Sequence, residues 1–208
     1  MTSPASEEIQ SDPHEMIKRL RKKAKLMQFC HGRLAESANR TYDCLSAFVV
    51  VISALCTVLI FADYQRIAAI TRVPGTVLQF VAGMLSVIVF VLSELLRRFD
   101  WSSQAGKHRE ALERYTAFLR DSEFFLKSEL PFMSCDQAVQ QSKDYEKIYL
   151  DAGQKSPPIS GGLKFLRLKQ EYLVTKEISI RLDKDPFVDV RRMWRRIGRE
   201  REIDRSSL

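Results

Sequence analysis

Small and polar residues in an apolar segment, 73–93, have the types and spacing best suited to chemistry. They recur at steps of three and four residues, which places them on one stripe of a helix. The stripe consists of Thr76, Gln79, Gly83, Ser86, Phe90 and Ser93, and Glu94 continues it. In a multimer this stripe can line an aqueous path, with Phe90 as an apolar constriction and Glu94 as a ring that favours cations. The alternative is packing, because membrane helices also contact one another through small and polar residues.

Two histidines are expected at similar distances from the apolar segments. His31 precedes Cys44 by thirteen residues and His108 follows Glu94 by fourteen. Helices that rise about 1.5 Å per residue would place both roughly 20 Å from the membrane, facing each other or symmetry mates. Protonation near pH 6 would then bias the helical bundle. The simpler interpretation is that each is a hydrogen-bonded interior histidine.

Arginines and one tryptophan dominate the C-terminal segment after Pro186. Three interpretations remain open: a solvated helix face, a surface for anionic lipid headgroups, or a site for a polyanion such as a nucleotide or oligonucleotide. A tryptophan among arginines suits either interfacial anchoring or base stacking. The candidate ligand-binding residues are Arg191, Arg192, Trp194, Arg195 and Arg196.

No enzyme motif accompanies these features. The sequence contains no nucleotide-binding glycine loop and no nucleophile motif, and its three histidines, at 14, 31 and 108, are not at metal-ligand spacing. The cysteines at 30, 44, 56 and 135 also lack metal or disulfide spacing. We therefore expect no catalytic residue, no metal and no cofactor, in a protein that is not an enzyme.

Two charge-free apolar segments must position the candidate residues. Residues 44–62 form a run of nineteen and residues 73–93 a run of twenty-one. A hydrocarbon core of about 30 Å needs about 20 helical residues, so each run suffices for one crossing. Two buried helices of a soluble protein would seldom lack charge on every face. The sequence therefore predicts an integral membrane protein with transmembrane helices at 44–62 and 73–93.

The distribution of basic residues predicts the orientation of this hairpin. Eight Lys and Arg residues precede the first span and twenty-three follow the second, whereas the short extracytoplasmic loop, 63–72, contains two. Basic residues near the ends of membrane spans favour the cytoplasmic side. Both termini are therefore expected in the cytoplasm.

Helical periodicity extends from both spans into the cytoplasm. Residues 1–13 are expected to be disordered, and residues 14–43 to form a helix that continues into the first span. After the second span, apolar and aromatic residues alternate at steps of four and three, as in the contact seam of a helical bundle. The seam residues are Trp101, Ala105, His108, Leu112, Tyr115 and Leu119. With no Gly or Pro near Arg97, we expect one unbroken helix as far as Pro131, able to transmit the state of the bundle to Phe90 and Glu94.

The remaining segments are also predicted to be helical. A capping box at Ser134 and Gln137 begins a helix that Gly153 ends. The predicted cytoplasmic bundle covers 94–160, and a basic helical region covers 161–208. The predicted fold is all-α, a two-span transmembrane hairpin continuous with a long-helix cytoplasmic bundle. Because two spans cannot enclose a pore, the pore interpretation also requires a homo-oligomer.

Two stretches that follow the hairpin carry a resemblance to a known family. WSSQAGKHREALERYTAFLRD, at 101–121, and KDYEKIYLDAGQKSPPIS, at 143–160, resemble the SLATT family of bacterial two-span effectors. The residues that carry the resemblance are Ala105, His108, Tyr115 and Leu119, and it covers about residues 14–160.

The resemblance implies a function for the whole chain. It implies a pore-forming ion channel, a homo-oligomer in the bacterial inner membrane, and we expect this oligomer to be a tetramer. Such an effector of anti-phage defence depolarises the membrane and arrests growth. A nucleotide or oligonucleotide messenger, made by an associated nucleotidyltransferase, would open the pore or hold it shut. Two alternatives stay open: a non-conducting membrane anchor or scaffold for a partner signalling enzyme, and a membrane-disrupting toxin without a defined pore.

Overall fold

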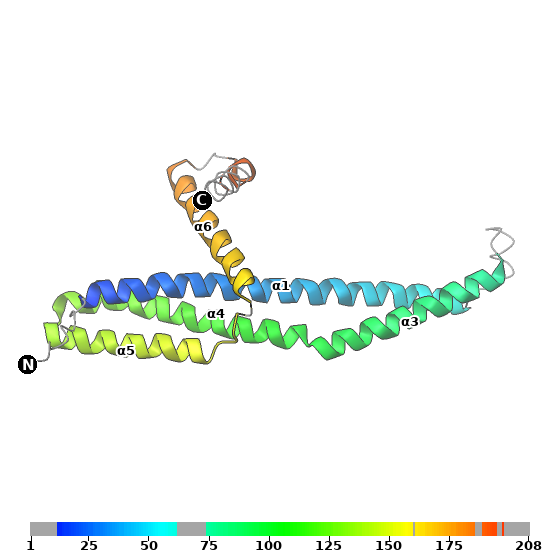
Figure 1. Ribbon diagram of the computed structural model, residues 1–208, viewed down its shortest axis with the longest axis horizontal. Coiled ribbons are helices and arrows are strands. Elements are labelled where there is room, and N and C mark those ends of the chain that lie inside the picture. The colour runs from blue at the N-terminus through cyan, green and yellow to red at the C-terminus, as the bar shows by residue number, and fades with distance from the viewer. Residues whose placement is uncertain (1–11, 62–73, 160, 186–188, 195–196, 198–208) are drawn as a thin grey trace, which may run out of the picture. The chain divides into compact units, whose positions relative to one another are not determined.

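The computed structural model describes residues 12–61, 74–159, 161–185, 189–194 and 197. These residues are almost entirely helical and include no strand, so the all-α prediction is confirmed. The long helices are α1 (Pro13–Phe61), α3 (Gly75–Phe99), α4 (Trp101–Phe124), α5 (Cys135–Gln154) and α6 (Gly162–Lys184) (Figure 1). They form two compact units, which we call the hairpin unit (34–107) and the bundle unit (1–33 with 108–208). The predicted loop 63–72 and nearly all of the predicted disordered segment 1–13 lie outside the described residues.

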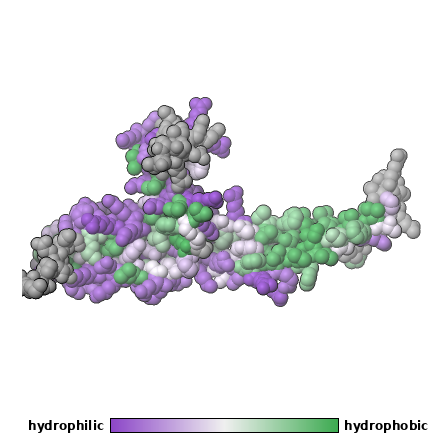
Figure 2. All heavy atoms as spheres, viewed as in Figure 1, coloured by the Kyte–Doolittle hydropathy of each residue, from purple (hydrophilic) through white to green (hydrophobic). Residues whose placement is uncertain are grey.

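The hairpin unit contains two helices that are long and apolar enough to cross a membrane. In their most apolar windows the mean hydropathy is 2.1 for α1 and 2.2 for α3, and only 11% and 6% of these windows are buried. Figure 2 shows the resulting hydrophobic surface over α3 and the second half of α1. Monomeric soluble proteins rarely expose a contiguous apolar surface of this extent. The exposed apolar surface thus supports a membrane protein.

α3 returns antiparallel to the second half of α1 and approaches it at an angle (Figure 1). The buried side chains between the two spans are small or branched: Ile52 and Cys56 on α1, and Ala82 on α3. Half-buried Leu78, Leu85 and Val89 share the face of Ala82. The inner face of α3 is therefore apolar, and its other faces are available to lipid, water or another chain.

α1 confirms the prediction that the N-terminal helix continues into the first apolar span. It runs for 49 residues without a break, joining the N-terminal amphipathic segment to the first span. Its start is capped by Asp12, whose carboxylate accepts a hydrogen bond from the backbone N–H of His14 at 3.0 Å. Such a cap satisfies one of the unpaired N–H groups at a helix start.

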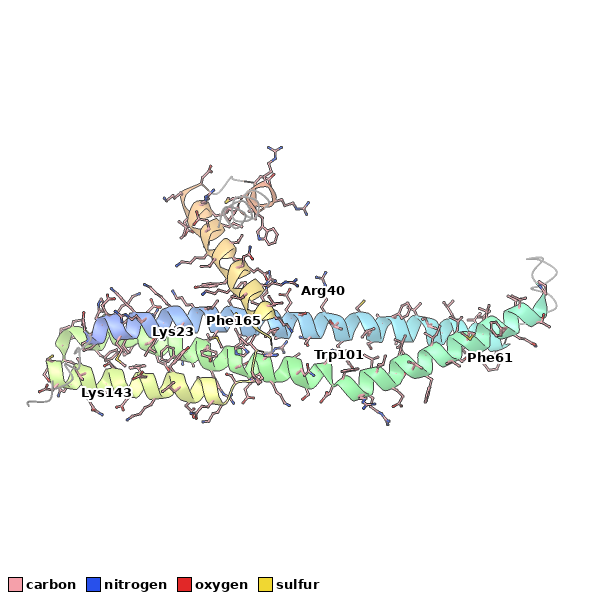
Figure 3. All side chains as sticks on the ribbon, in the orientation of Figure 1. Lys23, Arg40, Phe61, Trp101, Lys143 and Phe165 are labelled. Carbon is pink, nitrogen blue, oxygen red and sulfur yellow. The ribbon has the colours of Figure 1, made fainter. Side chains whose placement is uncertain are left out.

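The helical run that begins with α3 is interrupted at Asp100, where an unbroken helix was expected. Asp100 adopts the left-handed conformation, with φ 35° and ψ 49°, so α3 ends at Phe99 and α4 begins at Trp101 (Figure 3). Its carboxylate accepts a hydrogen bond from the N–H of Ser103 at 3.3 Å, and the side chain of Gln104 donates to the Phe99 carbonyl at 3.2 Å. Aspartate tolerates this conformation and caps helices. It therefore ends one helix and starts the next without Gly or Pro.

The bundle unit packs the first part of α1 against α4 and α5. Its core is apolar and aromatic, and consists of Ile17, Leu20, Ala24, Tyr115, Phe118, Leu119, Phe125 and Ala152. Charged side chains such as Lys23 and Lys143 are exposed (Figure 3). This division between an apolar core and a charged surface is that of a water-soluble bundle.

The connection between α4 and α5 contains two short irregular helices. α4 passes into a π-helical turn, η1 (Phe125–Glu129), and a 3₁₀ turn, η2 (Leu130–Phe132), which contains Pro131. The predicted capping box then begins α5: the Ser134 hydroxyl accepts from the N–H of Gln137 at 3.4 Å, and the Gln137 side chain accepts from the N–H of Ser134 at 3.3 Å. The end of the run near Pro131 and the capping box are confirmed.

A smaller apolar cluster joins α6 to the described part of the C-terminal segment. It contains Val174 and Ile178 of α6 with Met193 and Ile197, and half-buried Leu182 packs against it. The cluster covers one side of the C-terminal segment and leaves its charged residues outside the core.

Candidate functional site

The predicted stripe of α3 lies on the face that α1 leaves exposed. All six of its residues, from Thr76 to Ser93, are exposed, and Phe90 is 66% exposed. Ala82 and its half-buried neighbours Leu78, Leu85 and Val89 lie on a different face. The stripe is therefore not used for packing within one chain. Lipid, water or a second chain must cover it when the helix is in a membrane.

The polar side chains of the stripe differ in whether their hydrogen-bonding groups find a partner within the helix. The hydroxyls of Ser86 and Ser93 donate to the carbonyl oxygens of Ala82 at 3.0 Å and Val89 at 2.8 Å, four residues earlier. Both hydroxyls thereby use their hydrogen within the helix. Gln79 instead carries an exposed amide with two donors and an acceptor. Facing such an amide to hydrocarbon is costly, so Gln79 indicates water or another polar group beside α3.

Glu94, at the end of the stripe, has an ion-pair partner on its own helix. Its carboxylate lies 2.8 Å from the guanidinium of Arg97, one turn later, and 46% of the Glu94 side chain is exposed. The Arg97 cation offsets part of the negative charge that a ring of Glu94 residues would present. A cation preference would therefore depend on how far Arg97 stays paired.

His31 and His108 face each other in the bundle unit, which is the first of the two arrangements that their spacing allowed. Their Nδ1 atoms are 2.9 Å apart, and one ring must carry the hydrogen that it donates to the other. The His31 ring is fully buried and stacks on the Tyr115 ring, with centroids 5.7 Å apart and planes 16° apart. The Nε2 atom of His31 is buried and has no hydrogen-bond partner among the described residues.

Burial sets the protonation state of this histidine pair. Burial first, and then charge repulsion from the nearby His108, together lower the pKa of His31 from 6.5 to about 4. The pKa of His108 is also lowered, by burial and then by the positive charge of Lys164. Both rings are thus neutral at pH 7. The expectation that His31 protonates near pH 6 is corrected, because a buried imidazole resists charging.

Most residues of the predicted bundle seam are buried or half-buried in contacts within one chain. Tyr115 and Leu119 are buried in the core against α1, and Ala105 is also buried. Trp101, His108 and Leu112 are half-buried. The seam residues of the bundle unit therefore hold α4 against its own chain. An oligomer of this chain would therefore have to form through other surfaces.

The described part of the arginine-rich segment is a short capped helix. The carboxylate of Asp189 accepts hydrogen bonds from the backbone N–H groups of Arg191 at 2.9 Å and Arg192 at 3.3 Å. Both arginines are exposed, and Trp194 is 52% exposed, so they can meet a ligand. The other two candidate residues, Arg195 and Arg196, lie outside the described residues.

Sequence reasoning missed Arg21, which ties α1 to the end of α4. Its guanidinium donates to the Leu119 carbonyl at 2.6 Å, to the Ser122 hydroxyl at 3.0 Å and to the Glu123 carboxylate at 3.1 Å. These bonds lie just before the π-helical turn. Arg21 sits among other basic residues of α1, so no local pattern distinguished it.

The described residues contain no group of three or more His, Cys, Asp or Glu side chains that could hold a metal ion. No family model matches the chain, and no curated protein or solved structure matches it.

Proposed function

We propose that this chain forms an ion-conducting homo-oligomer in the bacterial inner membrane, with both termini in the cytoplasm. The observation that carries the proposal is the exposed polar stripe of α3, above all the amide of Gln79. Several α3 helices around a common axis would place this amide in water, with Phe90 as the constriction. A tetramer is the assembly that we expect.

The resemblance to SLATT effectors supplies the biological part of the proposal. The channel would act in anti-phage defence, depolarise the membrane and arrest growth, without enzymatic activity of its own. A nucleotide or oligonucleotide messenger from an associated nucleotidyltransferase would control it. The exposed Arg191, Arg192 and Trp194 support contact with a polyanion of this kind.

Ion flux from potassium-loaded liposomes containing the full chain tests the pore. We expect Phe90→Ser to raise the basal flux, because a polar side chain wets an apolar constriction. Phe80→Ser is the matched control, since Phe80 is 69% exposed but lies off the stripe. We expect Gln79→Leu to lower the flux. Equal effects at Phe80 and Phe90, or no flux from any variant, would contradict a pore lined by this stripe.

A second candidate is a non-conducting anchor for a partner enzyme, and one observation favours it. α6 exposes a stripe of large apolar side chains, with exposed fractions from 40% to 78%: Leu163, Leu166, Leu173 and Ile180. Such a stripe suits a protein partner. The anchor is favoured if the liposomes pass no ions under any nucleotide condition while the chain still binds the product of a neighbouring gene.

A further inference from the structure

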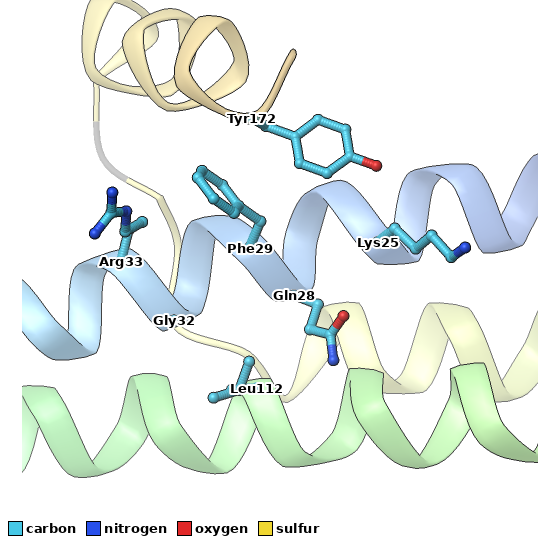
Figure 4. Close-up of a pocket in the computed structure, with 7 residues that line it drawn as sticks. All are labelled: Lys25, Gln28, Phe29, Gly32, Arg33, Leu112 and Tyr172. Atoms are coloured by element: carbon cyan, nitrogen blue, oxygen red, sulfur yellow. The ribbon is translucent and has the colours of Figure 1, made fainter. Parts of the chain in front are cut away.

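The bundle unit contains an open groove that no part of the proposed pore uses. It has a volume of about 420 Å³, within the range of small-molecule sites (Figure 4). One face of α1 supplies Lys25, Gln28, Phe29, Gly32 and Arg33. Leu112 of α4 and Tyr172 of α6 line the rest of the groove. Its chemistry is therefore mixed, with two aromatic walls, an amide and two cations.

The aromatic wall is held in place by contacts between α1 and α6. The rings of Phe29 and Tyr172 have centroids 5.5 Å apart and planes 58° apart. Arg33 forms an ion pair with Glu171, the neighbour of Tyr172, and its guanidinium lies 5.7 Å from the centre of the Phe29 ring. These contacts position the two rings before any ligand arrives. Because the two planes are tilted, a planar group can stack on one ring and meet the edge of the other, without first ordering α6.

Polar groups lie beside this wall. The amide nitrogen of Gln28 donates to the Thr116 hydroxyl at 2.8 Å, so its oxygen points away from α4 and can accept a hydrogen bond (Figure 4). The exposed Lys25 lies one turn before Gln28. Lys25 also ends a run, 18–25, that contains six Lys and Arg residues. The resulting positive potential attracts anions to this part of α1.

Gly32 lines the groove, and close packing between helices does not explain why this residue is a glycine. Glycine inside a helix is destabilising relative to alanine. A Cβ at this position would meet Leu112 Cδ1 at 3.7 Å, which is an ordinary contact. Close helix packing therefore does not require glycine here. A methyl group here would occupy space in the groove, because Gly32 lines it.

We propose that this groove binds a nucleotide, with the base against Phe29 and Tyr172 and the phosphate near Lys25. A nucleotide joins a planar aromatic group to an anion, which are the two chemistries that the groove offers. The proposal rests on the proposed nucleotide control and names its site. It differs from the arginine-rich segment that the sequence suggested.

The first test measures binding to the purified full chain in detergent micelles by isothermal titration calorimetry. The probes are AMP, GMP, CMP and UMP, with adenosine alone and inorganic phosphate alone as the separate halves. We expect at least one of the four nucleotides to bind. If AMP binds, adenosine alone and inorganic phosphate alone should each bind at least about tenfold more weakly than AMP. Phosphate binding as tightly as every nucleotide would identify a simple anion site, and no nucleotide binding would overturn the proposal outright.

Matched variants locate the site. Tyr172→Leu and Lys25→Gln should each weaken binding about tenfold, whereas Lys22→Gln, an exposed change on the same helix, should not. Gly32→Ala should weaken binding while raising the melting temperature. Gly106→Ala, in α4 with nothing within 4 Å of a Cβ, should raise the melting temperature and leave binding unchanged.

Two outcomes separate this site from its alternatives. If Arg191→Gln with Arg192→Gln abolishes binding while Tyr172→Leu and Gly32→Ala leave it intact, the groove is not the site. If the groove variants lose binding but wild-type liposomes never conduct ions, the groove stands and the channel fails. If nucleotide-dependent ion flux persists unchanged in the groove variants, the channel stands and the groove fails.

Discussion

Acidification from pH 7.5 to 5.5 should destabilise the bundle unit through His31. The pKa of His31 is lowered from 6.5 to about 4 by burial and by the proximity of His108. At pH 5.5 the unfolded chain therefore binds a proton at His31 that the folded chain does not. Because the unfolded state binds more protons between these two values, stability is complete above pH 6.5 and falls as the pH drops toward 4.

The size of this effect follows from the two pKa values. Proton linkage at His31 gives a loss on the order of 1 kcal/mol of unfolding free energy between pH 7.5 and 5.5. His108 acts in the same direction, because burial and Lys164 also lower its pKa. The two rings cannot both charge easily, since their Nδ1 atoms lie 2.9 Å apart.

Urea unfolding of the full chain in mild detergent, at both pH values, measures this loss. The near-ultraviolet circular dichroism of tyrosines in the bundle core reports the transition, because Tyr115, Tyr145 and Tyr149 contact the rings of that core. His31→Phe preserves a ring beside Tyr115 but cannot bind a proton. We expect it to lose most of the pH effect, whereas the control His14→Asn retains it.

One result would refute this account of the histidine pair. If wild type and His31→Phe lose the same unfolding free energy on acidification, the burial of neutral His31 is not the origin of the pH dependence. Carboxylates elsewhere would then account for it. A loss that appears only below pH 4 would place the transition outside the window set by the two pKa values.

Three further substitutions test local features by urea unfolding in the same detergent. Arg21→Met should lower the unfolding free energy by about 1 to 3 kcal/mol, because it removes the charge-assisted hydrogen bonds that a largely buried guanidinium donates to the Leu119 carbonyl and the Ser122 hydroxyl; an equal loss from Arg19→Met would contradict this. Asp100→Ala should cost about 1 kcal/mol or more through the lost cap and the left-handed backbone, whereas Asp100→Gly should cost less; equal losses would refute the conformational part. Ser134→Ala should cost about 1 kcal/mol as the capping box is lost, and no loss would show that α5 starts without it.

Periodic features of the fold could be predicted from the sequence, because they depend on residues close together in the chain. The two apolar runs, the long first helix and the Ser134 capping box all follow from local spacing. Counting from the apolar segments placed His31 and His108 at similar heights, but it left open whether they face each other or symmetry mates, and the structure shows the first. Their pKa values could not follow, since these depend on burial by α1, α4 and the charge of Lys164.

Contacts between distant segments were beyond sequence reasoning. The groove depends on Phe29 and Tyr172, which are far apart in the chain and meet where α6 packs on α1, beside the Arg33–Glu171 ion pair. Arg21 likewise reaches Leu119 across the bundle. Each of these residues resembles its neighbours in type, so spacing alone gives no signal for the pairing.

The interruption at Asp100 changes how the proposed channel would be controlled. A continuous helix would pass motion from α4 to α3 through backbone hydrogen bonds, but here the two helices meet at one residue with left-handed dihedral angles. The stiffness of this joint then depends on the Asp100 cap and on the bond from Gln104 to the Phe99 carbonyl. Gly and Pro are the usual helix stops, but an aspartate that caps the next helix interrupts the run in the same way through its side chain. Under the proposed function, motion would therefore pass between α4 and α3 through a polar joint rather than through a continuous helix.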